Sequence, residues 1–158
     1  MYREQLTEAL RKFSYGFYIV SARSGNYLAA GAVNWLSQAS FNPPLIMTAI
    51  KQESHLHEFI SRSGAFAVSV VGEEQEHLLP EFFKATKVEG NKINGLPFAD
   101  GMTGSPVFVD LPASVECKVV EKISMGDHSI FIGEIVNAGV RYDVEPLVDK
   151  ETEYKYAG

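Results

Sequence analysis

Neutral polar side chains are concentrated in residues 34–44, between apolar runs at 29–33 and 45–50. A buried polar group without a hydrogen-bond partner costs about 1–3 kcal/mol, so its own turn, water or a ligand must satisfy it. Two interpretations stay open. Either this is a loop whose side chains cap its own backbone, which composition alone favours, or it is a rim that offers donors and acceptors to a flat heteroaromatic ring. The side chains concerned are Asn34, Ser37, Gln38, Ser40 and Asn42.

A second group has the residue types that bind an anion. A predicted strand ends at Lys51 and a predicted helix begins at Ser54. Unpaired N–H groups and the dipole favour negative charge at a helix N-terminus. Lys51 adds a positive charge, Ser54 a hydroxyl and His55 a further donor. The alternative is a capped helix beside a solvated lysine. An anion site here, with a hydrogen-bonding rim beyond it, would suit a phosphorylated ring cofactor.

The remaining reactive side chains indicate little chemistry of their own. His128 follows Asp127 and precedes an apolar run, so it is either a turn histidine tied to Asp127 or a substrate contact at a rim. His55 and His57 are two residues apart and do not share a helix face. With one cysteine and four histidines, we expect no metal site. Cys117 lies in an alternating run, which favours a small core residue over a nucleophile.

Composition limits the class of protein. A chain of 158 residues is expected to form a single domain over 1–158. Its 14 basic and 20 acidic residues give a net charge of −6, so we expect neither nucleic acid nor an anionic membrane as a partner. The single cysteine, Cys117, excludes an internal disulfide and favours a reducing, cytoplasmic location. No apolar run reaches the length of a membrane span.

Hydrophobic periodicity predicts a mainly β chain with short helices. We expect helices at residues 3–13, 54–64 and 73–79, the last stopped or bent at Pro80. Residues 84–112 are expected to form loops with short strands. Strands are predicted at 15–22, 27–33, 45–50, 65–71, 114–123 and 128–140. A sheet this large in a short chain is best closed, which removes its edges, so we predict an antiparallel β-barrel with peripheral short helices.

Five stretches together resemble a known family. They are "YGFYIVSARSG", "AVNWLSQASFNPPLI", "SHLHEFISRSGAFAVSVV", "TGSPVF" and "GDHSIFIGEIVNAG". In this order the chain resembles the flavin reductase-like, FMN-binding split-barrel family. It is most similar to the branch that contains NADH:rubredoxin oxidoreductase-type proteins and the C-terminal flavin reductase domains of diflavin flavoproteins.

The resemblance implies an antiparallel split β-barrel homodimer that binds FMN, with FAD as a second candidate, near the subunit interface. His128 would lie where the nicotinamide approaches, as the residue assigned to catalysis. Trp35 would either stack near the flavin or pack into the partner subunit. The residues that the resemblance assigns to the cofactor are Ala32, Val33, Asn34, Trp35, Ser37, Gln38, Ala39 and Ser40 along the ring, and Lys51, Ser54 and His55 at the phosphate.

The implied activity is hydride transfer from NADH or NADPH to the flavin, followed by electron transfer to an acceptor such as a rubredoxin-like protein. Hydride transfer needs no general base, so His128 would orient the substrate or shield the ring. Flavin could remain bound or diffuse as a substrate. Alternatives of another class are a non-catalytic flavin-binding or electron-relay protein, or a binder of heme or pyridoxal phosphate. For pyridoxal phosphate the basic residues are mainly Lys51, with Arg62 and Lys84 as helpers.

Overall fold

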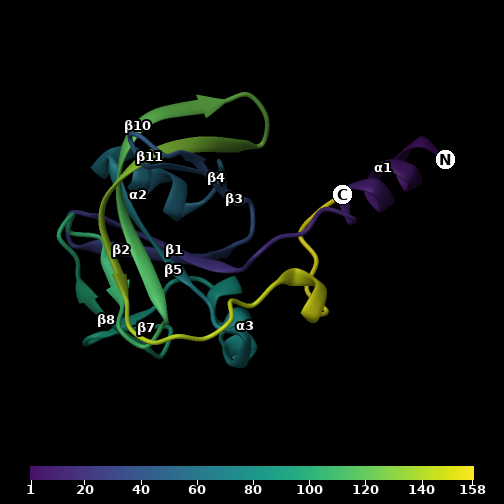
Figure 1. Ribbon diagram of the computed structural model, residues 1–158. Coiled ribbons are helices and arrows are strands. Elements are labelled where there is room, and N and C mark those ends of the chain that lie inside the picture. Colours follow the sequence, from purple (N-terminus) through teal and green to yellow (C-terminus); the bar gives the residue numbers. More distant parts are fainter.

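The structure is a computed structural model that covers the whole sequence, residues 1–158 (Figure 1). Helical segments are few and short: α1 (Tyr2–Leu10), α2 (His55–Ser63), η1 (Glu73–Leu78), α3 (Leu79–Phe83) and η2 (Asp149–Glu151). The strands are β1 (Tyr18–Ser24), β2 (Tyr27–Val33), β3 (Leu36–Ser40), β4 (Leu45–Lys51), β5 (Ala65–Val70), β6 (Val88–Glu89), β7 (Lys92–Ile93), β8 (Leu96–Asp100), β9 (Pro106–Phe108), β10 (Ala113–Ser124) and β11 (His128–Val140).

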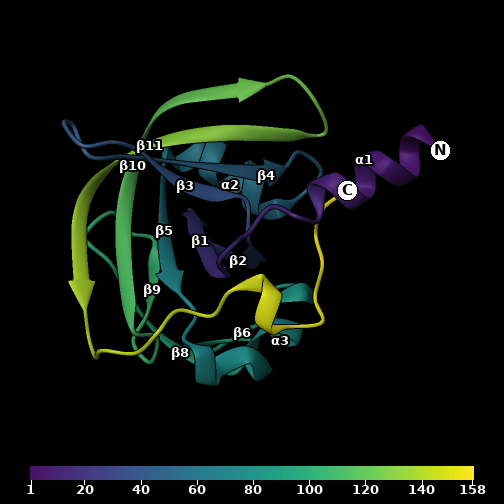
Figure 2. The same cartoon turned by 45° about the vertical axis from the view of Figure 1, so that its right-hand side comes forward.

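The main sheet is antiparallel, with the strand order β2-β1-β5-β10-β11-β4-β3, and it curls around a core (Figure 2). The chain passes directly from β2 to β3 through Asn34 and Trp35, yet these strands stand at opposite ends of the hydrogen-bonded order. The barrel is therefore split between β2 and β3 rather than fully closed. A smaller sheet, β6-β7-β8-β9, lies beside it. The prediction of a mainly β, antiparallel split barrel is confirmed.

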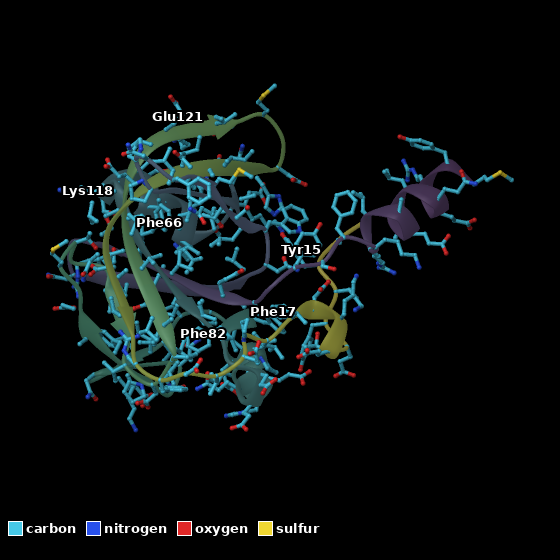
Figure 3. The ribbon with its side chains drawn as sticks, viewed as in Figure 1. Tyr15, Phe17, Phe66, Phe82, Lys118 and Glu121 are labelled. Carbon is cyan, nitrogen blue, oxygen red and sulfur yellow. The ribbon has the colours of Figure 1, made fainter.

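Two clusters of buried apolar side chains hold the sheet together. One gathers around Phe17, Phe82 and Phe108, and the other around Phe66 and Phe131. Figure 3 labels Phe66 and Phe82 in separate parts of the barrel. Burial of such side chains contributes about 1.5–3 kcal/mol each. The first cluster includes Ala30 of β2, and the second includes Ala29 of β2 with Ile46 and Ile50 of β4, so the clusters hold the two strands that carry the candidate site.

The helix predicted after Ser54 is confirmed, and its ends have the expected chemistry. Ser54 Oγ accepts a hydrogen bond from the His57 backbone N–H at 3.1 Å. Gly64 ends the helix at φ 68°, a left-handed conformation that glycine adopts without a Cβ penalty. Leu56 and Ile60 face the core. This helix therefore lies against the barrel with its N-terminus directly after β4.

Three local predictions need correction. Residues 36–40 form the edge strand β3, because Ser37 and Gln38 pair with Met47 and Ile46 of β4. Pro80 does not stop the helix that precedes it, since η1 continues into α3 and Pro80 sits in the first turn, where no N–H donor is needed. The first helix ends at Leu10, has no buried residue, and projects from the barrel (Figure 1). No helix here combines the length and apolar character needed to span a membrane.

Close packing at Gly133 on β11 predicts a destabilised variant. A Cβ added there would lie 2.7 Å from both Cys117 Cβ and Phe66 Cζ. We expect Gly133→Ala to reduce the free energy of unfolding by about 1–3 kcal/mol, because the core must move to admit the methyl group. Urea unfolding measures the change. Gly139→Ala, on the same strand with nothing within 4 Å, is the control. Equal stability of the two variants would contradict the close packing.

Candidate functional site

A cavity of about 630 Å³ opens at the split of the barrel. Its walls come from β2, the β2–β3 connection, the end of β4, the start of α2, the segment after α3, the start of β11 and the C-terminal tail. This volume falls in the range of small-molecule and cofactor sites. The predicted site residues that line it are Ala32, Val33, Asn34, Trp35, Lys51, Ser54, His55 and His128.

The other predicted ring contacts do not line this cavity. Ser37, Gln38 and Ala39 are exposed on β3. Ser37 Oγ donates to the Gln38 carbonyl at 2.9 Å, and Gln38 Nε2 donates to the Ser40 carbonyl at 3.2 Å. These side chains therefore hydrogen-bond to carbonyl groups of their own segment, as in the first of the two interpretations of the sequence. The segment that they stabilise is a strand and not a loop. The predicted ring contacts up to Trp35 therefore line the cavity, and those from Ser37 onward do not.

One wall of the cavity is lined by residues with small side chains or none. Ala29, Ala30, Gly31 and Ala32 follow each other along β2 and all line the cavity. Since β2 pairs only with β1, its outer edge presents backbone donors and acceptors toward the split. The Thr86 hydroxyl takes up part of that edge, as it accepts from the Ala30 N–H at 3.1 Å and donates to the Ala30 carbonyl at 3.2 Å. The backbone beyond it, toward Asn34, offers a neutral hydrogen-bonding rim.

The cavity is positively charged although the chain is acidic. Lys51, Lys84 and Lys155 line it together with a single acid, Glu53, whereas the whole chain carries a net charge of −6. A concave site lined by one sign of charge attracts ligands of the opposite sign. The sequence predicts Lys51 as an anion contact but not Lys155, because nothing in the local sequence places the tail against the cavity.

The three residues predicted to bind an anion, Lys51, Ser54 and His55, line the cavity where β4 passes into α2. Ser54 Oγ donates to the Lys51 carbonyl at 2.8 Å while it accepts from His57 N–H, which fixes the turn between strand and helix. The N–H groups of His55 and Leu56, the first two of α2, remain without a backbone or side-chain acceptor. The His55 side chain is 87% exposed and lies 3.7 Å from Glu58, so it is free to turn toward a ligand.

Three aromatic rings form the mouth of the cavity. The ring centroids of Trp35 and His128 are 4.7 Å apart, and those of Trp35 and Tyr156 are 4.9 Å apart. His128 Nδ1 lies 2.7 Å from Asp127 Oδ1, and this hydrogen bond, followed by the charge of His128, lowers the pKa of Asp127. The bond to Asp127 that the sequence suggested is therefore present, and His128 also lines the cavity.

Cys117 takes no part in the site. It is fully buried in the core. Burial, and then the neighbouring charge of Glu116, raise the pKa of its thiol to about 12. A thiol with that pKa stays protonated near neutral pH, so it is neither a nucleophile nor a metal ligand. The interpretation of Cys117 as a core residue is confirmed.

Residues 10–158 match the flavin reductase like domain, and the chain belongs to this family. It is 34% identical over 142 residues to the ferric-chelate reductase (NAD(P)H) of Archaeoglobus fulgidus, across 89% of this chain and 84% of that protein. It is 31% identical over 143 residues to the high molecular weight rubredoxin of Moorella thermoacetica, of which it spans 62%. The styrene monooxygenase flavin reductase of Pseudomonas putida S12 has the same fold, with a TM-score of 0.75, 26% identity and coverage of 91% and 90% of the two chains.

Proposed function

We propose that this protein is an NAD(P)H-dependent flavin oxidoreductase that holds FMN in the cavity at the split of the barrel, with FAD as a second candidate. The observation that carries the proposal is that one cavity of about 630 Å³ combines a wall of alanine and glycine on β2 with three lysines. A flavin mononucleotide has a flat ring and a phosphate, so the residues present fit it. Family membership supports the same function.

The isoalloxazine ring is proposed to lie against residues 32–35, where the edge backbone of β2 faces its polar atoms. The phosphate is proposed to lie at Lys51, Ser54 and His55, where a lysine charge and the N-terminus of α2 meet. Ser37, Gln38, Ala39 and Ser40 are not part of this proposal, because they do not line the cavity. Backbone groups of β2 take over the role that their side chains had in the sequence prediction.

A bound flavin supplies the hydride-accepting chemistry that no side chain of this protein can supply. The chain contributes position and environment. The apolar wall of β2 excludes water from the reacting ring, and the lysines around the cavity favour the negative charge of the reduced state. His128 is proposed to border the nicotinamide position and to orient or shield the rings. Hydride transfer requires no proton from His128.

An anaerobic absorbance titration tests the proposed function. Protein loaded with FMN and separated from free flavin should retain the yellow flavin spectrum, and NADH or NADPH should bleach it. Comparison of the two nucleotides also identifies the donor. Loss of all flavin on gel filtration, with NADH oxidation restored by added flavin, would mean that flavin is a diffusing substrate. Protein that neither binds flavin nor oxidises either nucleotide would overturn the proposal.

Two acceptors follow from the relatives and remain proposals for this chain. The Archaeoglobus fulgidus relative is named for a ferric chelate and the Moorella thermoacetica relative for a rubredoxin. Reduction of Fe(III)-EDTA and of a purified rubredoxin, measured with the same FMN-loaded protein, separates a small-molecule acceptor from a protein acceptor. Family membership does not favour the non-catalytic, heme and pyridoxal phosphate alternatives. The proposed location is cytoplasmic, supported by the single unpaired Cys117.

We propose a homodimer formed through the outer face of β4, β10 and β11. Met47, Ile123 and Ile130 expose 42%, 38% and 38% of their surface there, and Ile123 pairs with Ile130 across the β10–β11 hairpin. Exposed apolar faces of this kind mark interfaces between proteins. We expect Ile130→Lys to halve the mass measured by light scattering, and Val140→Lys, 79% exposed near the other end of β11, to leave it unchanged. A wild-type protein of monomeric mass would contradict the dimer.

A further inference from the structure

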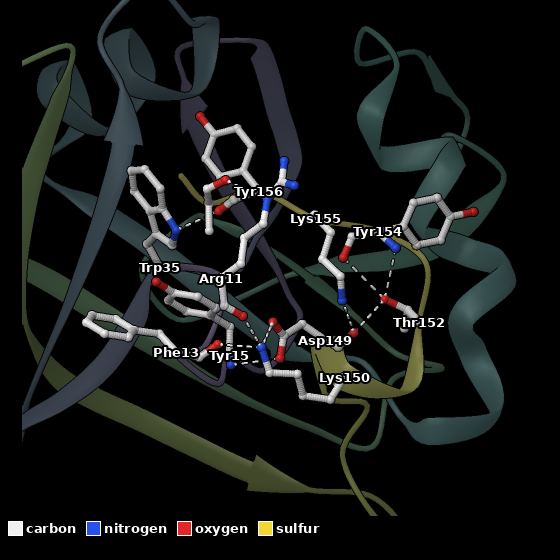
Figure 4. Close-up of polar contacts among 11 residues, drawn as sticks. Arg11, Phe13, Tyr15, Trp35, Asp149, Lys150, Thr152, Tyr154, Lys155 and Tyr156 are labelled. Carbon is white, nitrogen blue, oxygen red and sulfur yellow. Dashed lines mark hydrogen bonds and ion pairs between the residues drawn. The ribbon is translucent and has the colours of Figure 1, made fainter. Parts of the chain in front are cut away.

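The C-terminal tail crosses the mouth of the cavity, and Tyr156 makes its central contacts there. Trp35 Nε1 donates a hydrogen bond to the Tyr156 carbonyl at 2.9 Å. The Tyr156 hydroxyl lies 2.6 Å from His128 Nε2. Figure 4 shows the Tyr156 segment beside the Trp35 indole, with the tail coming from η2. One tail residue thus engages His128, which borders the proposed nicotinamide position, and Trp35, which lies beside the proposed flavin ring.

These contacts leave His128 with no free ring nitrogen. Its Nδ1 lies 2.7 Å from the Asp127 carboxylate, which can only accept, so Nδ1 carries the proton and donates it. In the neutral imidazole Nε2 is then an acceptor, and the Tyr156 hydroxyl donates to it. A substrate amide cannot bond to His128 while Tyr156 is in place.

Tyr156 also packs against the indole ring of Trp35. The two ring centroids are 4.9 Å apart, a distance typical of aromatic pairs. The indole N–H is already donated to the Tyr156 backbone. The Tyr156 phenol, a flat ring with a hydrogen-bonding edge, therefore has the same kind of contacts that a nicotinamide ring with its carboxamide would seek.

The tail is held firmly at its base and weakly at its tip. At the base, the buried Asp149 carboxylate accepts from the Tyr15 N–H at 3.0 Å, and the rings of Phe83 and Tyr154 are in contact with centroids 5.2 Å apart. Beyond Tyr154 the tail has no regular secondary structure, and Tyr156 is 50% exposed. Segments with few buried contacts open at low free-energy cost.

The last residues of the tail rest on a support that is itself unburied. Thr7 Oγ1 donates to the Gly158 carbonyl at 2.9 Å, and Arg11 Nε donates to the Ala157 carbonyl at 3.5 Å. Thr7 lies in α1, which has no buried residue. The tip can therefore leave the mouth without disturbing the core.

We propose that Tyr156 controls the access of the nicotinamide: in the free protein it occupies Trp35 and His128, and an entering nicotinamide ring displaces it. This inference rests on the proposed function. Displacement lowers the apparent affinity for the nucleotide by the fraction of molecules with the tail open. Removing the tyrosine side chain removes that competition, so the variant should bind the nucleotide more tightly.

Steady-state kinetics of the FMN-loaded, full-length protein test the inference. We expect Tyr156→Ala to lower KM for NADH about five- to tenfold. In this variant the hydrogen bond to His128 and the aromatic contact with Trp35 no longer compete with the nicotinamide. Tyr156→Phe keeps the ring and loses only the hydroxyl, so its KM should fall between those of wild type and Tyr156→Ala. Tyr27→Ala is the matched control, because Tyr27 is 74% exposed and does not line the cavity.

Fluorescence provides a readout that does not need NADH. Trp35 is the only tryptophan of the chain, so its emission reports on the mouth of the cavity. Acrylamide should quench Trp35 more strongly in flavin-free Tyr156→Ala than in flavin-free wild type. Equal quenching would show that the tail does not cover Trp35, and would overturn the inference.

The kinetic outcomes are distinct. A raised KM or a reduced kcat in Tyr156→Ala would show that the Tyr156 side chain helps to bind or position NADH. An unchanged KM would show that the tail does not compete with NADH. Either result overturns the inference while normal FMN binding keeps the proposed function. Wild-type protein that binds no FMN and oxidises no NADH would instead remove the proposed function, and this inference with it.

Discussion

Ala32→Phe is expected to weaken FMN binding about 100-fold, because it places an aromatic ring where the flavin is proposed to lie and forces ring or backbone to move. Ala32 is half-buried on β2 and lines the cavity of about 630 Å³. Ala32 also packs against the apolar cluster around Phe17 and Phe108, so we expect the melting temperature to fall by a few degrees as well. Quenching of flavin fluorescence during titration measures the affinity.

Ala39→Phe is the matched control for this prediction. Ala39 has the same side chain and lies on β3, the next strand along the chain, but it is exposed and outside the cavity. We expect it to bind FMN as the wild type does. If Ala39→Phe weakens binding as much as Ala32→Phe, the flavin lies along residues 37–40, as the sequence first suggested, and the cavity is not its site.

Lys51→Met is expected to weaken FMN binding by about 10- to 100-fold, the size of a lost hydrogen bond to a charged group. Lys51 ends β4 shortly before α2, so its ammonium group and the helix N-terminus would both act on the proposed phosphate. Met preserves most of the length and the apolar part of the side chain, so packing should be retained. Isothermal titration with FMN, compared with riboflavin, isolates the phosphate contribution.

The riboflavin comparison makes the prediction specific. Lys51→Met should leave riboflavin affinity near the wild-type value, because riboflavin has no phosphate. Lys118→Met removes the same charge at an exposed position on β10 that does not line the cavity, and Figure 3 labels it away from Tyr15 and the termini. An equal loss of FMN affinity in both lysine variants would show a general effect of net charge and would contradict a phosphate site at Lys51.

Local sequence determined several parts of this protein. Ser54 and Gly64 predict both ends of α2, because N-capping and the left-handed C-cap depend on side chains within a few residues of each other. Alternation and a Gly-Asp turn predict β10 and β11. The strand–helix junction at Lys51 and Ser54 indicates an anion site for the same reason. The family, too, is evident from motifs that run in order along the chain.

Only the tertiary structure decided which polar residues face the cavity. Residues 36–40 look like a loop in isolation, and they become β3 because β4 pairs with them. In this strand Ser37 and Gln38 are exposed and outside the cavity, whereas Asn34 and Trp35 line it at the split. The stability of this strand comes from its hydrogen bonds to β4, so the polar composition of residues 36–40 does not reveal that they form a strand.

The tail shows the same limit more clearly. The Tyr156 hydroxyl meets a histidine 28 residues away, and the Tyr156 carbonyl meets a tryptophan 121 residues away. Short-range patterns report helices, turns and caps, whose partners are neighbours in the chain. Contacts between distant residues arise only when the folded core brings their elements together. The sequence by itself therefore determined the family, the helix caps and the strand–helix junction at Lys51 and Ser54. The packing of the barrel decided the mouth of the cavity and what lies across it.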